Sequence, residues 1–123
     1  MSKFVFGSMR GLVEKETFAY DEELNNGNSG SAKTINWKLG NRQRITLTGA
    51  PCVFTFTNPL SPAVLTLKLI QGSGGSKTVT WPSSVKWVGR TAPTLTTTAA
   101  YIDIVGMYFD GTNYYATASL NFG

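Results

Sequence analysis

The chain has 123 residues, the length of a single domain with one hydrophobic core. Charged residues make up only 15% of it, below the quarter or so typical of soluble domains. The absence of histidine excludes Ser-His-Asp and Cys-His nucleophilic catalysis, and the single cysteine, Cys52, excludes an intrachain disulfide. No apolar stretch reaches the roughly 20 residues of a membrane span or resembles a signal peptide. We therefore expect a soluble protein that is made in a cytoplasm and does not insert into a membrane.

The net charge of +4 is unevenly distributed along the chain. Residues 14–23 contain five acidic residues and one lysine, a local charge of −4, so the remaining residues carry +8. The basic residues are dispersed from Lys33 to Arg90, whereas a nucleic-acid-binding protein concentrates them in a patch or stripe. This distribution argues against nucleic-acid binding. It favours an acidic N-terminal arm that lies on a basic body, either its own or a neighbour's.

Residues 1–23 are expected to form an extended arm that attaches the body to a partner. Gly7 and Gly11 interrupt the apolar residues and weaken a helix by about 1 kcal/mol each. The candidate partner-binding residues of the arm are Phe4, Phe6, Met9 and Leu12.

Residues 24–123 are expected to form a single β-domain without internal repeats. After a loop at 24–31, apolar and polar residues alternate in successive short runs, the pattern of half-buried strands. These runs cover residues 34–39, 44–48, 52–57, 64–70, 77–81 and 101–105. The alternation predicts that Cys52 is buried beside Phe54, and that Asp103 points to solvent, opposite Ile102 and Ile104.

Turn residues separate these runs at intervals of roughly ten residues, the spacing of β-sandwiches and barrels. Asp110-Gly111 predicts a hairpin over 108–115, and Gly72–Gly75 is expected to be another hairpin loop. Gly72-Ser-Gly-Gly-Ser-Lys-Thr78 lacks the Gly-Lys-Ser/Thr ending of a phosphate-binding loop. The predicted fold is an all-β, antiparallel, jelly-roll-like sandwich of about eight strands, preceded by the arm.

Residues suited to catalysis are sparse. Two carboxylates fall in the main β region, Asp103 and Asp110, and Asp110 has a turn role that accounts for it. No clustered ligands suggest a metal site, and no motif suggests a cofactor. We expect a protein that is not an enzyme.

Aromatic residues are the strongest candidates for ligand binding. Trp87, Tyr114 and Tyr115 are possible glycan-binding residues, because exposed aromatic rings stack on sugars or anchor protein contacts. The alternative is structural: Trp81 packs in the core and Trp87 clamps a loop.

The chain also resembles a β-module found at the C-terminal ends of tail-fibre and related exterior proteins of tailed bacteriophages. The resemblance covers about residues 24–122 in order. It rests on these segments: Gln43–Gly49, Phe54–Pro59, Leu67–Gln71 with the Gly-rich turn after it, Val79–Pro82, Val85–Trp87, Ala92–Thr96 and Phe109–Tyr115.

The resemblance implies a β-sandwich that assembles as a homotrimer on the outside of the virion. Family members of this kind end a long fibre protein, whereas this chain begins with a short arm and no shaft. We therefore expect direct attachment to other virion proteins, as a capsid decoration, tail or fibre component. The alternative is a receptor-binding module that recognises a host surface glycan.

Overall fold

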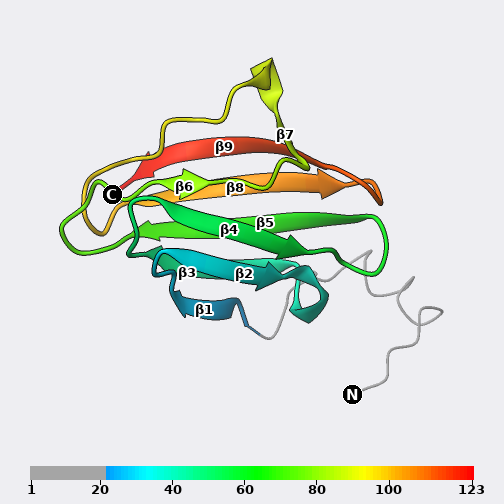
Figure 1. Ribbon diagram of the computed structural model, residues 1–123, viewed down its shortest axis with the longest axis horizontal. Coiled ribbons are helices and arrows are strands. Elements are labelled where there is room, and N and C mark those ends of the chain that lie inside the picture. The colour runs from blue at the N-terminus through cyan, green and yellow to red at the C-terminus, as the bar shows by residue number, and fades with distance from the viewer. Residues whose placement is uncertain (1–21) are drawn as a thin grey trace, which may run out of the picture.

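The computed structural model describes residues 22–123, which form two stacked β-sheets (Figure 1). The strands are β1 (Leu24–Asn28), β2 (Ala32–Asn36), β3 (Arg42–Leu47), β4 (Cys52–Thr57), β5 (Ala63–Gln71), β6 (Val79–Thr80), β7 (Val85–Trp87), β8 (Ile102–Phe109) and β9 (Tyr114–Phe122). Two short 3₁₀ turns, η1 (Trp37–Leu39) and η2 (Val88–Arg90), are the helical elements of this part of the chain. The all-β prediction is confirmed, with nine strands in place of about eight.

The prediction of an antiparallel, jelly-roll-like sandwich is wrong. One sheet has six strands in the order β1-β3-β5-β8-β9-β7, and the other has three in the order β2-β4-β6. Five of the seven strand pairings are parallel, and the antiparallel pairs are β5 with β8 and β8 with β9. The six-stranded sheet is therefore mixed, and the three-stranded sheet is parallel.

The parallel pairing arises because the chain crosses from one sheet to the other after each of its first five strands. Strands β1, β3 and β5 lie in the six-stranded sheet, and β2, β4 and β6 lie in the three-stranded sheet. Each connection is a corner between layers, including the Gly72–Gly75 turn that the sequence predicted as a hairpin loop. The chain thus winds three times in the same sense before the β8–β9 hairpin closes the larger sheet.

Successive corners at one end of the winding are in close contact, and two glycines make this possible. A Cβ on Gly49 would overlap the carbonyl oxygen of Gly30, and one on Gly72 would overlap that of Leu47. The Gly72 amide instead donates a hydrogen bond to the Leu47 carbonyl at 3.0 Å. These positions favour glycine because the backbone of one turn approaches that of the turn before it.

The core lies between the two sheets and follows from two-residue alternation. Leu65, Leu67 and Leu69 of β5 are each at most 1% exposed and face the three-stranded sheet, where Phe54 is 2% exposed. Full burial stabilises each such side chain by roughly 1.5–3 kcal/mol. Cys52 is buried as predicted, with its side chain fully enclosed in this core.

The predicted hairpin between β8 and β9 is confirmed. Asp110 accepts hydrogen bonds from the amides of Thr112 and Asn113 at 2.9 and 2.8 Å, and Gly111 takes a positive φ of 107°. The Asn113 and Thr112 amides hold the pKa of the Asp110 carboxyl below its usual value. The hairpin brings Tyr108 opposite Tyr115.

Tyr114 is the central aromatic residue of the core. Its ring packs against Phe109 and Phe56 at centroid distances of 4.6 and 5.0 Å, and its side chain is fully buried. Its hydroxyl donates a hydrogen bond to Asn58 Oδ1 at 2.6 Å. Burial raises the pKa of Tyr114 to about 12, because low polarity disfavours the phenolate.

We predict that Tyr114→Phe lowers the free energy of unfolding by about 1 kcal/mol at neutral pH, because it removes this hydrogen bond. The wild-type advantage should be present below pH 10 and shrink as the pH rises toward 12, because the unfolded tyrosine ionises first while the folded one keeps its proton. Urea unfolding of both proteins across this range measures the difference. A difference in unfolding free energy that does not change with pH would contradict the raised pKa of Tyr114.

Candidate binding surface on the six-stranded sheet

The six-stranded sheet has one face on the core and one face that no other described element covers. We call the second the outer face; it is formed by the side chains that alternate with the core positions. Its apolar members are Val64, Ile70, Ile102, Ile104, Tyr108, Tyr115 and Phe122, and its basic members are Arg42, Arg44, Lys68 and Lys86. Exposed apolar side chains gathered on one face are typical of an interaction surface.

One row of the outer face crosses four neighbouring strands. Cα pairing aligns Val64 with Tyr108, Tyr108 with Tyr115, and Tyr115 with Lys86. Val64 is 65% exposed, and Tyr108 and Tyr115 are 51% and 48% exposed. The row therefore offers two phenol rings and an aliphatic group to solvent, with an ammonium group at one end.

A shallow hollow of about 440 Å³ lies beside this row, at the β7 edge of the sheet. Trp87 and Tyr115 both line it, together with Lys86 and Thr117. The Trp87 ring is half-buried and packs edge-on against Trp81, with centroids 5.1 Å apart, so one ring is fixed by the core cluster. Pairing of Trp87 with buried Ala116 puts the indole on the core side of the hollow, and the Tyr115 phenol is on its outer side. Aromatic rings at such an edge suit a planar or sugar-like ligand.

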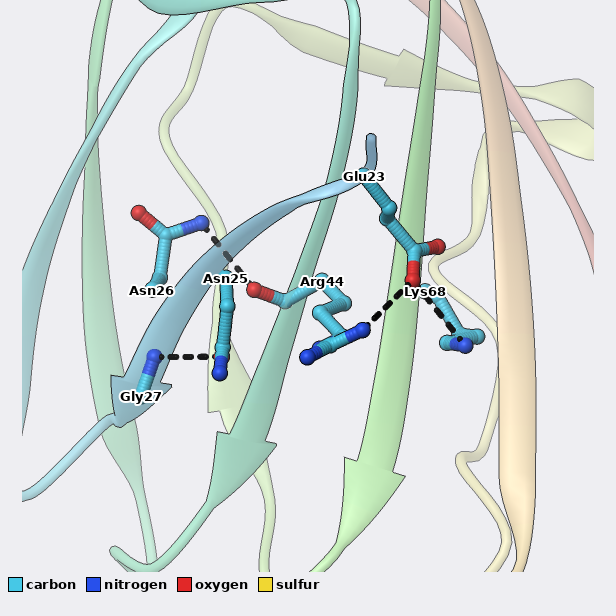
Figure 2. Close-up of polar contacts among 6 residues, drawn as sticks. All are labelled: Glu23, Asn25, Asn26, Gly27, Arg44 and Lys68. Carbon is cyan, nitrogen blue, oxygen red and sulfur yellow. Dashed lines mark hydrogen bonds and ion pairs between the residues drawn. The ribbon is translucent and has the colours of Figure 1, made fainter. Parts of the chain in front are cut away.

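A cluster of charged groups occupies the opposite side of the outer face (Figure 2). Glu23, just before β1, extends its carboxylate over the sheet to Arg44 Nη1 at 3.3 Å and to Lys68 Nζ at 3.1 Å. Arg44 and Lys68 are paired neighbours on β3 and β5. Glu23 thus lies between two cations that the sheet holds side by side. All three side chains remain about a third exposed, so each pair stabilises the fold by at most ~1 kcal/mol.

The far side of the molecule is chemically different. The outward positions of the three-stranded sheet carry threonine and two aliphatic residues: Ala32, Thr34, Val53, Thr55 and Thr80. None of these five carries a charge or an aromatic ring. The apolar and basic groups are therefore concentrated on the outer face of the larger sheet.

The structure separates the three aromatic residues that the sequence suggested for glycan binding. Trp87 and Tyr115 meet at the hollow, whereas Tyr114 points into the core and is not part of any surface. Adjacent residues of a strand point to opposite faces, so Tyr114 and Tyr115 could not both be exposed. The arm residues Phe4, Phe6, Met9 and Leu12 lie outside the described residues.

Sequence reasoning missed the contribution of Tyr108 and Val64. The signal was present, because both occupy positions that alternate with core residues of their own strands, Phe109 and Leu65. An apolar residue at an outward position is the informative exception to the alternating pattern.

Asp103 is buried, so the prediction that it points to solvent is wrong. Ile102 and Ile104 are on the outer face, and Asp103 is 3% exposed on the core side of β8. Its carboxylate accepts hydrogen bonds from Thr96 N at 2.7 Å, Thr96 Oγ1 at 2.6 Å and Asn121 N at 2.9 Å. Burial is tolerated because these donors replace water.

Asp103 and Gln71 together fix the long connection between η2 and β8. Gln71, 3% exposed, donates from Nε2 to the Thr96 carbonyl at 2.6 Å, and its Oε1 accepts from the Lys77 amide at 2.8 Å. Thr96 is therefore held through its amide, hydroxyl and carbonyl. This arrangement places Leu95, 9% exposed, in the core. The role of Asp103 in this geometry is to position a loop.

Residues 22–123 contain no group of three or more His, Cys, Asp or Glu side chains placed to hold a metal ion. Within the same residues, no helix has the length and apolar character to cross a membrane. Comparisons of the chain with protein-family models, with curated proteins and with solved structures found no match.

We predict that Asp103→Ala destabilises the protein by about 3 kcal/mol, because it leaves buried amide donors without an acceptor. Asp103→Asn should lower the stability less, since asparagine keeps the shape of the side chain and one acceptor oxygen. Urea unfolding monitored by tryptophan fluorescence measures both. An alanine variant as stable as the wild type would show that the carboxylate does not hold the loop.

Proposed function

We propose that this chain is a non-enzymatic structural protein on the exterior of a tailed-bacteriophage particle. In this proposal the arm, residues 1–23, attaches the β-sandwich body to other virion proteins, and the bodies assemble as a homotrimer. The protein is made in the host cytoplasm and resides in the virion.

The observation that carries the proposal is the outer face of the six-stranded sheet. It combines exposed Val64, Tyr108 and Tyr115 with four basic side chains on a rigid sheet, and aromatic residues and arginine are enriched in protein interfaces. The phage setting is supported by the resemblance of residues 24–122 to exterior phage modules. The buried carboxylate of Asp103 accepts hydrogen bonds from Thr96 and Asn121, which supports a structural role for it.

We predict that deleting residues 2–16 abolishes incorporation into particles and leaves the body folded. Mass spectrometry of purified particles measures incorporation, and circular dichroism with thermal unfolding measures the fold. Incorporation at the wild-type level would overturn the anchoring role.

A matched pair of variants separates loss of apolar contacts from loss of length. Replacing Phe4, Phe6, Met9 and Leu12 by serine should have the effect of the deletion. Replacing Ser2 and Ser8 by alanine should leave incorporation unchanged, because it removes no apolar group.

A second candidate function is recognition of a host surface glycan, favoured by the hollow between Trp87 and Tyr115. We predict that Tyr115→Ala weakens binding of the protein to host cells or to purified surface polysaccharide, because stacking on a sugar ring requires the exposed phenol. Tyr101→Ala is the control, since Tyr101 is also exposed but precedes β8, away from the hollow. Equal binding by the wild type and both variants would exclude this hollow as a glycan site.

A further inference from the structure

The outer face combines two kinds of chemistry, and a partner must match both. One half presents Val64, Tyr108 and Tyr115. The other half presents Arg44 and Lys68, already bridged by one carboxylate. An occupant that stabilises both halves needs apolar side chains followed or preceded by acidic ones.

The chain's own N-terminal sequence has this composition in one continuous stretch. Residues 4–13 contain most of its apolar side chains, and residues 14–23 contain five acidic residues and one lysine. The last of these acidic residues, Glu23, is the carboxylate that contacts Arg44 and Lys68. The acidic stretch therefore ends on the basic half of the outer face (Figure 2).

The distances permit the apolar residues to reach the aromatic row. From β1 to β9 is four strand spacings, or about 19 Å. The chain from Leu12 to Glu23 has eleven residue-to-residue steps and spans about 36–40 Å when extended. Strand β1 runs parallel to β3 and β5, so it starts at the end of the sheet where Val64 and Tyr108 lie.

Because the N-terminal segment is covalently joined to the body, it should bind the outer face of its own chain in preference to that of a second copy. A short tether gives an effective concentration in the millimolar range, far above the concentration of free subunits in solution. Ion pairing to Arg44 and Lys68 strengthens the contact itself at low ionic strength.

We propose that in the free subunit residues 4–20 lie across the outer face of their own six-stranded sheet. The acidic residues cover Arg44 and Lys68, and the apolar residues cover Tyr108 and Tyr115. This placement does not depend on the phage setting. Attachment of the arm to another chain would then require the arm to leave this face.

Paramagnetic relaxation in the full-length protein tests this placement. Ser8→Cys, between Phe6 and Met9, carries a nitroxide, and wild-type protein treated with the same reagent checks that buried Cys52 does not react. Amide signals of Gly106, Tyr108 and Thr117 should lose most of their intensity, while Thr34 and Thr55 on the other sheet keep theirs. Equal effects on both sheets would overturn the proposal.

Two controls make the result specific. When spin-labelled protein is mixed with isotope-labelled wild type, the amide signals of the wild type should keep their intensity. If they lose it, the segment lies on a neighbouring copy and the proposal is overturned. Reversing Arg44 and Lys68 to glutamate should restore most of the lost intensity, whereas reversing Lys38 and Lys77 should not. Because the measurement needs no particle, its outcome is independent of the incorporation experiment.

Discussion

The structure depends on one core between two sheets. Successive strands of the winding chain lie alternately in the two sheets, and both sheets contribute side chains to this core. Each passage through the six-stranded sheet contributes inward residues such as Ile45 and Leu67, and each passage through the three-stranded sheet contributes residues such as Phe54. No single turn can bury its apolar face alone, so stability depends on stacking successive turns. The stacked corners at Gly49 and Gly72 are a consequence of this packing.

The same constraint explains the buried polar groups. Where a strand begins or ends, an inward position is filled by a polar side chain that bonds the neighbouring loop. Gln43 donates to the carbonyls of Asn36 and Gly40 at 3.0 and 2.8 Å. Gln71 donates to the Thr96 carbonyl, and Asp103 accepts from the Thr96 amide. Buried hydrogen bonds of this kind fix loop positions at little net cost in stability. The long connection can therefore cover the core beneath β8 and β9 without forming a strand.

The asymmetry between the two outward surfaces follows from sheet size. The three-stranded sheet exposes a narrow surface of threonine and small residues, whereas the six-stranded sheet exposes a wide surface that includes Tyr108 and Tyr115. A wide, rigid surface with apolar and basic groups is suited to holding an extended acidic segment or a neighbouring protein. The contact of Glu23 with Arg44 and Lys68 indicates how such a segment approaches it.

The sequence by itself determined most of the strands, the buried Cys52 and the Asp110 hairpin, because two-residue alternation and turn residues act over short distances. The prediction of a loop at 24–31 is wrong, since β1 (Leu24–Asn28) lies there, and the predicted run 34–39 ends in η1. It misplaced Asp103, because the partners that make its burial possible, Thr96 and Asn121, become neighbours only in the folded chain. It also could not distinguish hairpins from corners, since alternation is the same in parallel and antiparallel strands. The pairing offsets differ as well: Leu24 pairs with Gln43 and Arg42 with Thr66, so successive turns have unequal lengths and leave no repeat in the sequence. Only the tertiary structure decided which strands pair, and with them which side chains share the outer face.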